Sequence, residues 1–247
     1  MSALVAIPVY NEERYLSRVL AAVRRHADDI LVVNDGSTDR TGALLAEWPE
    51  VYTLTHPENR GYGQSLIDAF QFAAARDYDW VITMDCDEQH EPDQIPDFLA
   101  AARRDDADVI SGSRYLSEHP ADDTPPVDRR RINQVINRLL ELLLGLRLSD
   151  SFCGFKAHRV AALRRLRLDE PGYAFPLQFW VQCARAGLRI REIPVRRIYR
   201  DRNREFGGTL DDATARLQHY LEVLVSELCS GPSLSKKDEC LAETRCQ

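Results

Sequence analysis

The 247-residue sequence lacks several features that mark common classes of protein. Its six cysteines include no Cys-x-x-Cys pair and no spacing typical of a zinc site, so we expect reduced thiols in a cytosolic protein. No apolar run reaches the roughly 18–20 residues that cross a bilayer, and the apolar N-terminal run ends at Pro8. We therefore expect neither a membrane span nor a signal peptide. The net charge of −7 argues against a nucleic-acid partner held by overall charge.

The sequence also has no Gly-x-Gly-x-x-Gly motif after its first apolar run, which argues against the usual dinucleotide-binding domain. Short apolar runs alternate instead with stretches of helical periodicity. This alternation predicts an α/β fold with a mostly parallel central sheet and helices on both faces. The predicted strands cover residues 4–7, 30–33, 51–54, 80–84, 108–111 and 189–195.

Two long helices are predicted in the second half of the chain. Residues 130–148 are strongly apolar at helical spacing, which favours a helix buried in the core over a helix on a membrane surface. Residues 209–228 are expected to form a final amphipathic helix. We expect a single domain over residues 1–230 and a disordered polar tail over residues 231–247.

The most informative stretch is residues 80–90, in which a buried strand ends in polar residues. If the extended backbone continues briefly past Met84, then Asp85, Asp87 and Gln89 point to the same side. Such oxygen-bearing side chains suit a hard cation such as Mg²⁺ or Mn²⁺. An acidic surface turn is the alternative, because Asp-x-Asp also occurs at residues 77–79 and 106–108. Only the pair at residues 85–87 closes a strand at its carboxyl end, where ligands bind in open α/β sheets.

Six short motifs follow one another over roughly residues 3–200. They are Ile7-Pro-Val-Tyr-Asn-Glu12, Val32-Val-Asn-Asp-Gly-Ser-Thr-Asp39, Asn59-Arg-Gly-Tyr-Gly63, Met84-Asp-Cys-Asp-Glu-Gln-His90, Gly112-Ser-Arg-Tyr115 and Asp150-Ser-Phe-Cys-Gly-Phe155. Each motif is modest alone, but in order and spacing the set resembles the family 2 glycosyltransferases of GT-A fold. Within that family the chain looks most like the dolichyl-phosphate mannosyltransferase-type enzymes. The resemblance implies a nucleotide-sugar-binding half over residues 1–116 and an acceptor half over residues 117–230.

The resemblance further implies an enzyme that transfers a sugar, with inversion, from a GDP- or UDP-sugar. Pro8, Tyr10 and Glu12 would line the nucleotide pocket, with Asp35 beside the base or the ribose. A carboxylate at a strand end can accept hydrogen bonds from base NH or ribose OH groups. The alternative role for Asp35 is to cap the next helix, but Ser37 or Thr38 is expected to fill that need.

The resemblance assigns the metal and the leaving group to the turn that follows the predicted strand at residues 80–84. Asp85 would lie near the ribose and the metal, and Asp87 and Gln89 would hold a Mg or Mn ion that bridges the diphosphate. The ion would neutralise the leaving nucleoside diphosphate as a Lewis acid. His90 would either orient this loop or serve the fold alone.

The acceptor implied by the resemblance is a polyprenyl (dolichyl-type) phosphate at the cytoplasmic face of a membrane, where the protein would be peripheral. A phosphate monoester is largely ionised at neutral pH, with a second pKa of about 6, so it needs cations rather than a general base. Arg114 and Arg130 match family positions for this catalytic role. Arg202 and Arg204 are added from the charge of the loop over residues 200–204.

Two departures from the family pattern concern the acceptor side. Cys153 stands where the lipid-phosphate enzymes usually have Ser or Thr, and the late loop reads Arg204-Glu-Phe-Gly-Gly208 instead of Gly-x-Ser-Lys. One alternative is therefore a hydroxyl acceptor on a glycan, small molecule or protein. That chemistry would need a carboxylate base, for which Asp150, Glu192 and Asp201 are candidates. A non-catalytic nucleotide-sugar-binding subunit is the other alternative.

Overall fold

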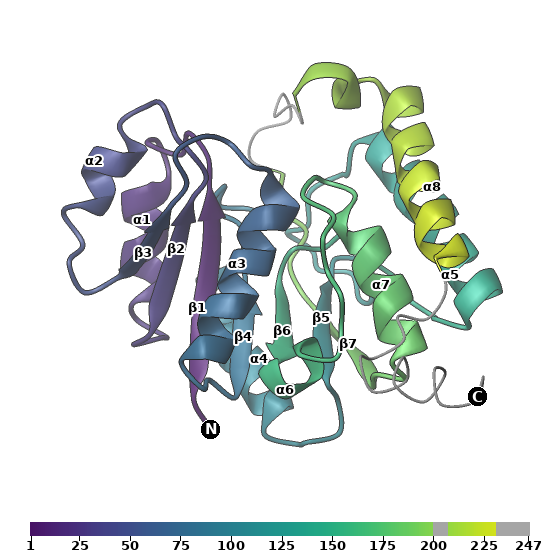
Figure 1. Cartoon of the computed structure of the whole chain (residues 1–247), viewed down its shortest axis with the longest axis horizontal. Helices are drawn as coiled ribbons and strands as arrows, with labels where there is room; N and C mark the ends of the chain where they lie inside the picture. Colours follow the sequence, from purple (N-terminus) through teal and green to yellow (C-terminus); the bar gives the residue numbers. More distant parts are fainter. Residues whose placement is uncertain (200–206, 231–247) are drawn as a thin grey trace, which may run out of the picture.

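A seven-stranded sheet forms the centre of the computed structural model, which describes residues 1–199 and 207–230 (Figure 1). The strand order across the sheet is β3-β2-β1-β4-β6-β5-β7. The strands are β1 (Ala3–Val9), β2 (Ile30–Asn34), β3 (Tyr52–Thr55), β4 (Trp80–Thr83), β5 (Val109–Ser113), β6 (Lys156–Arg159) and β7 (Ile190–Pro194). Within the described residues, β1, β2 and β4 are buried along most of their length, as expected for strands covered on both faces.

Six of these strands run in the same direction, so the prediction of a mostly parallel sheet is confirmed. β6 is the exception, because it lies between β4 and β5 and is antiparallel to both. β6 was not among the strands predicted from the sequence, and it directly follows the turn at residues 150–155. The chain first forms β6 and only then α6 (Val160–Leu163). The sequence of β6, Lys-Ala-His-Arg, has no run of apolar residues to mark it as a strand.

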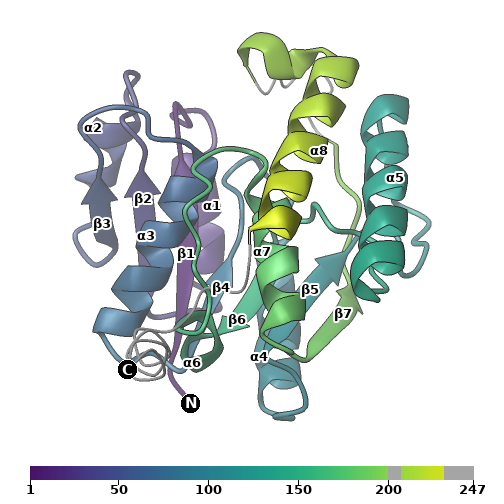
Figure 2. The same cartoon turned by 45° about the vertical axis from the view of Figure 1, so that its right-hand side comes forward.

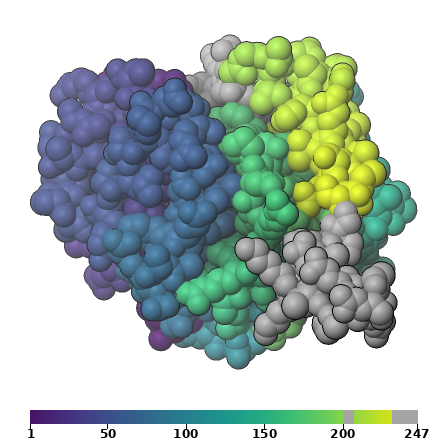
Figure 3. Space-filling model, in the orientation of Figure 1, coloured from purple at the N-terminus to yellow at the C-terminus, as the bar shows by residue number. Residues whose placement is uncertain are grey.

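Helices cover both faces of the sheet, and each face has its own hydrophobic cluster. α1 (Leu16–Val23), α2 (Thr41–Leu45) and α4 (Ile95–Ala102) pack on one face. The other face carries α3 (Tyr62–Ala75), α6 and α7 (Phe175–Arg185), and α5 (Val127–Leu144) and α8 (Ala213–Cys229) extend this layer beside α7 (Figure 2). α8 lies on the surface along one side of the molecule, as the space-filling view shows (Figure 3).

The expected cap of α2 is wrong. α2 begins at Thr41 after Arg40, which makes no side-chain cap. Ser37 and Thr38 instead hold the turn after β1, since the Ser37 hydroxyl accepts the Asn11 N–H at 2.9 Å and the Thr38 N–H donates to Asn11 Oδ1 at 2.8 Å. The two loops that follow β1 and β2 are therefore tied to each other.

The parallel strands bring their carboxyl ends to one edge of the sheet. β1, β2 and β4 are neighbours, so the loops after Val9, Asn34 and Thr83 meet there. β6 starts at the same edge, because Lys156 pairs with Thr83. The turn at residues 150–155 therefore also reaches this edge. Among residues 1–199 and 207–230, no helix has both the length and the apolar character that crossing a membrane requires.

Candidate active site

A cavity of about 660 Å³ lies at this edge of the sheet, within the usual size range of small-molecule sites. Loops after β1, β2 and β4 and the start of α3 line one end, and α5, α7 and α8 line the other. Most of the residues that the sequence assigns to the site contribute to its wall, namely Pro8, Tyr10, Glu12, Asp35, Asp85, Asp87, Gln89 and Arg114. Arg130 is the exception, and its neighbour Arg129 lines the cavity instead.

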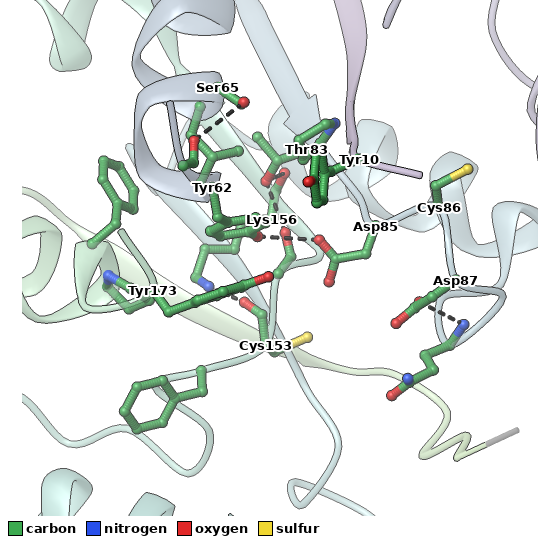
Figure 4. A pocket seen from close by; sticks show the side chains of 18 of the residues that line it. Tyr10, Tyr62, Ser65, Thr83, Asp85, Cys86, Asp87, Cys153, Lys156 and Tyr173 are labelled. Atoms are coloured by element: carbon green, nitrogen blue, oxygen red, sulfur yellow. Dashed lines mark hydrogen bonds between the residues drawn. The ribbon is translucent and has the colours of Figure 1, made fainter. Parts of the chain in front are cut away.

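The turn after β4 is only partly extended. Met84 and Cys86 are almost fully buried, while Asp85 and Asp87 are more exposed and border the cavity (Figure 4). The expected alternation therefore holds as far as Asp87. Beyond it the expectation of extended backbone is wrong, because Glu88 has a φ of 58° and the Gln89 N–H donates to Asp87 Oδ1 at 3.1 Å. A local turn, rather than a straight strand, brings Gln89 to the cavity.

Asp85 is held by three neighbours. The Tyr62 hydroxyl donates to Asp85 Oδ1 at 3.1 Å, and the Asp85 N–H donates to His90 Nδ1 at 3.0 Å. Burial lowers the pKa of His90 to about 4, so the ring is neutral at neutral pH. The hydrogen bond from Asp85 assigns the remaining ring proton to Nε2, which leaves Nδ1 free to accept. Gly154 packs directly against the carboxylate, since a Cβ at that position would lie 2.6 Å from Asp85 Oδ2.

The chemistry of the predicted metal ligands fits an ion that is bound together with phosphates. Among residues 1–199 and 207–230, no group of three or more His, Cys, Asp or Glu side chains is arranged to hold a metal. The predicted set differs from such a group, because it combines the carboxylates of Asp85 and Asp87 with the amide of Gln89. Mg²⁺ typically takes one or two carboxylates and completes its shell with waters and substrate phosphates. The residues present therefore suit a cation that arrives with a diphosphate.

Asp35 is the centre of a buried hydrogen-bond network. It accepts the backbone N–H groups of Arg60 and Gly61 at 2.8 Å each, and His56 Nδ1 lies 2.6 Å from its Oδ1. The other ring nitrogen of His56 contacts Asp68 at 2.8 Å. Asp35 thus borders the cavity while it fixes the loop before α3. His56 was not predicted as a site residue, although it directly follows β3 at the carboxyl edge of the sheet.

Arg114 forms a buried ion pair. Its Nε and Nη2 donate to the two oxygens of Asp150 at 2.6 and 2.9 Å, and Asn133 donates to Asp150 Oδ1 at 2.7 Å. Burial alone would raise the pKa of Asp150, but the Arg114 guanidinium and the hydrogen bonds from Arg114 and Asn133 bring it below its ordinary value. Asp150 is therefore an ionised structural anion that already has partners, which is a poor arrangement for a general base.

The carboxylate of Glu192 also has a structural role. It accepts the Ser149 and Asp150 N–H groups and the Ser149 hydroxyl at 2.9–3.1 Å. Of the three bases considered for a hydroxyl acceptor, Asp150 and Glu192 thus support the turn itself. Asp201 lies outside the described residues, as do Arg202 and Arg204.

Three guanidinium groups lie close to the ring of Tyr115. Arg130 lies 3.6 Å from the ring centroid, and Arg114 and Arg197 lie 5.7 and 5.6 Å from it. Within the described part of the chain, Arg130 Nη1 is buried without a hydrogen-bond partner. Arg130 is therefore close to the cavity wall through Tyr115, even though it does not form that wall itself.

Aromatic side chains form much of the opposite end of the cavity, which is called the aromatic end below. They come from the 150–155 turn, the loop before α7, α7 itself and α8, and comprise Phe152, Tyr173, Phe175, Phe179 and Tyr220. Tyr62 stacks on Tyr173 with ring centroids 5.7 Å apart, so the aromatic end adjoins the Asp85 end (Figure 4). Sequence reasoning missed these aromatic residues and also Lys156, because they lie in separate segments that only the fold brings together.

The model of the family described as "Glycosyl transferase family 2" matches residues 4–167, more than half of the chain. The chain belongs to glycosyl transferase family 2. The predicted family is confirmed, and the protein is a glycosyltransferase rather than a non-catalytic subunit.

This family 2 glycosyltransferase has well-matched curated relatives. It is 32% identical over 231 residues to an undecaprenyl-phosphate mannosyltransferase of Micrococcus luteus, covering 89% of this chain and 94% of the relative. It is 30% identical to a polyprenol monophosphomannose synthase of Mycolicibacterium smegmatis, covering 78% of this chain and 76% of the relative.

Solved structures confirm the GT-A fold of the glycosyltransferase. The glucosyl-3-phosphoglycerate synthase of Mycobacterium tuberculosis, in complex with Mn²⁺, UDP and glucosyl-3-phosphoglycerate, matches with a TM-score of 0.71 at 20% identity. The match covers 92% of this chain and 79% of that structure. At this identity the likeness concerns the fold alone.

Proposed function

We propose that this family 2 glycosyltransferase transfers a hexose, with inversion, from a GDP- or UDP-sugar to a polyprenyl phosphate in the presence of Mg²⁺ or Mn²⁺. The observation that carries the proposal is the composition of its cavity. The Asp85–Gln89 turn lines the same cavity as Arg114 and the aromatic end. The two bacterial relatives described above are named for undecaprenyl-phosphate and polyprenol acceptors.

At the donor end, Asp85, Asp87 and Gln89 would hold the cation, and Pro8 and Tyr10 would line the nucleotide pocket. A bound cation would supply Lewis-acid stabilisation of the leaving nucleoside diphosphate. The protein's own contribution is to hold the carboxylates in place before the donor arrives. Tyr62, His90 and Gly154 do this for Asp85, as their contacts show.

At the acceptor end, the geometry favours a phosphate nucleophile over a hydroxyl group. A hydroxyl acceptor requires a carboxylate that can take its proton. Asp150 is fully buried in its pair with Arg114, and Glu192 accepts hydrogen bonds from the turn at Ser149. A phosphate monoester is already ionised and needs cations only. Arg114 and Arg129 in the cavity wall would supply positive charge, with Arg130 and Arg197 beside Tyr115.

The outer face of α5 supports a membrane-bound acceptor. The expectation of a core helix is only half right, because Ile132, Ile136 and Leu140 are buried but other apolar residues of the same helix are not. Val135, Leu142 and Leu143 are 44, 64 and 54% exposed, and Arg138 and Arg147 lie on the exposed surface nearby. Apolar side chains with neighbouring arginines are typical of helices that lie on anionic lipid. We propose that α5 holds the enzyme peripherally on a cytoplasmic membrane face.

A thermal-shift screen identifies the donor. GDP-, UDP- and other nucleotide-sugars are compared with and without Mn²⁺, because a ligand that binds the folded protein raises its stability. We expect one nucleotide base to raise Tm in a manner that depends on Mn²⁺ and is lost in Asp87→Asn. Asp97→Asn is the matched control, since Asp97 is an exposed residue of α4 away from the cavity. An equal response in Asp87→Asn would refute the assigned metal site.

A second assay tests the acceptor with the donor found in the screen. Farnesyl phosphate and farnesol share one apolar chain and differ only in the phosphate. We expect transfer to farnesyl phosphate and none to farnesol. Transfer to farnesol alone would refute the phosphate acceptor and support the hydroxyl alternative.

A further inference from the structure

Lys156 is unusual in both sequence and position. It is the only lysine before residue 236, and every other permanently charged cationic side chain in that part of the chain is an arginine. It begins β6 beside Thr83, the last residue of β4, at the edge of the sheet where the cavity lies. Its side chain is only 6% exposed, yet it contributes to the wall of the cavity (Figure 4). A buried lysine therefore borders the cavity.

The surroundings of Lys156 do not balance its charge. Its Nζ donates to the backbone carbonyl of Cys153, and the Trp180 ring centroid lies 5.5 Å away. Within residues 1–199 and 207–230, the ammonium group forms no ion pair, and Cys153, Asp150 and Asp85 favour its charged form only through their electrostatic influence. Burial nevertheless lowers the pKa of Lys156 below its ordinary value. Transfer of an ammonium group from water is unfavourable unless a partner anion compensates it.

Lys156 also lies at the junction of the two ends of the cavity. On one side is Asp85 with its donor Tyr62, and on the other is the turn that carries Phe152 and Cys153 (Figure 4). A sugar donor and an acceptor must meet between these two ends. An anionic group of either substrate would therefore approach the ammonium group.

We propose that Lys156 is an anion-binding residue whose ligand is a phosphate group of a substrate. The proposal rests on the proposed function only for the identity of the acceptor, since a nucleoside diphosphate and a phosphate monoester offer the same oxyanion. A lysine suits this position because its charge is compact and its three donors can rotate. The ligand supplies the direct counter-charge that the described side chains around Lys156 do not, so binding of phosphate relieves the cost of the buried ammonium group.

Two substitutions separate this role from a structural one. Lys156→Met keeps an unbranched side chain that is one atom shorter and removes the charge, and Lys156→Arg keeps the charge. For the ligand-free protein we expect Lys156→Met to have the same Tm as the wild type or a higher one, because an uncompensated buried charge is lost. A residue that only supports the Cys153 turn would instead show a lower Tm in the Met variant and unchanged affinity for every ligand.

Calorimetric titration distinguishes the two sources of phosphate. The probes are GDP and UDP with Mn²⁺, farnesyl phosphate, and farnesol as an uncharged control. We expect Lys156→Met to bind at least one of the phosphate probes tenfold or more weakly, with Lys156→Arg closer to the wild type. A loss confined to the nucleotides assigns Lys156 to the donor diphosphate, and a loss confined to farnesyl phosphate assigns it to the acceptor. Affinities within twofold of the wild type for all probes overturn the proposal.

A labelling experiment covers the case in which the Met variant does not fold. The wild-type chain has lysines only at positions 156, 236 and 237, so reductive methylation is simple to map by mass spectrometry. We expect UDP or GDP with Mn²⁺, or farnesyl phosphate, to slow methylation of Lys156 severalfold while Lys236 and Lys237 react at their ligand-free rate. Equal methylation of Lys156 with and without every probe overturns the proposal. If the wild-type protein binds nucleotide but not farnesyl phosphate, the proposed phosphate acceptor is refuted. The methylation of Lys156 with and without nucleotide still tests its role in binding the donor.

Discussion

Gly154→Ala should disable the enzyme without unfolding it. Gly154 lies in the turn before β6, and a Cβ there would meet Asp85 Oδ2 at 2.6 Å, Tyr62 Oη at 2.9 Å and Asp85 Oδ1 at 3.0 Å. Ordinary contact begins at 3.4 Å, so the carboxylate must retreat by about 0.8 Å. No positive φ is involved at Gly154, so the backbone itself accepts alanine.

The expected effect on activity is large because Asp85 is proposed to position the metal and the ribose. Misplacement of a reacting group by about 1 Å costs roughly 10²-fold in rate. Insertion of one methyl group into a packed site costs about 1–3 kcal/mol of stability. We therefore expect kcat/KM for sugar transfer to fall about 10²-fold, while urea unfolding remains cooperative and the free energy of unfolding falls by no more than about 3 kcal/mol.

Gly42→Ala is the matched control for this substitution. Gly42 lies within α2, and a Cβ added there would have Asn34 Nδ2 as its nearest neighbour, at an ordinary 3.7 Å. The control should keep wild-type activity and gain a little stability, because alanine favours helix by up to about 1 kcal/mol over glycine. If Gly154→Ala transfers sugar within twofold of the wild type, the assigned role of Asp85 is wrong.

Three further substitutions test the buried pair, the acid response and the membrane face. Asp150→Asn leaves the Arg114 guanidinium buried without its anion, so urea unfolding should show a loss of about 3–5 kcal/mol; a loss below about 1 kcal/mol would contradict the pairing. Hydrogen bonds from Arg189 and the charges of Arg189 and Arg159 lower the pKa of Asp108 to about 2. Because this folded-state pKa lies below the unfolded value near 4, the stabilisation is complete above pH 4 and is lost as pH falls towards 2. Urea midpoints measured from pH 2 to 5 should therefore vary less in Asp108→Asn, and an unchanged pH profile would contradict this assignment. Leu142→Glu should weaken binding to anionic vesicles, while transfer to farnesyl phosphate in solution persists. Gln134→Glu is the control, because it makes the same change of charge at an exposed polar position of α5. This control should bind vesicles more strongly than Leu142→Glu.

The parallel core of the fold was predictable because its strands carry plain apolar signals. β1, β2 and β4 consist mostly of apolar residues that are buried along most of their length, and each is followed by a polar turn. β6 was not predictable in the same way. Its Lys156 and His158 are buried polar residues that line the cavity. A search for apolar runs cannot identify a strand of this kind.

Site residues that belong to one contiguous motif were predictable from the sequence. Site residues that the fold brings together from separate segments were missed. Asp85 and Asp87 follow one strand directly, so the sheet geometry alone brings them to the binding edge. His56 and Tyr173 reach the site through β3 and the loop before α7, and no local sequence signal joins them to Asp35 or Tyr62. The pairing of Arg114 with Asp150 was likewise hidden, because 36 residues separate the two side chains.

Mass spectrometry of the lipid product tests the central claim most directly. The enzyme is incubated with a polyprenyl phosphate, Mn²⁺ and the nucleotide-sugar selected by thermal shift, and the lipid fraction is analysed for a polyprenyl phosphohexose. We predict a product heavier than the acceptor by one hexosyl unit, absent after EDTA treatment and absent with Asp87→Asn but present with Asp97→Asn. Undiminished product without a divalent cation would contradict the assigned donor site, and sugar transfer to hydroxyl acceptors alone would contradict the assigned acceptor.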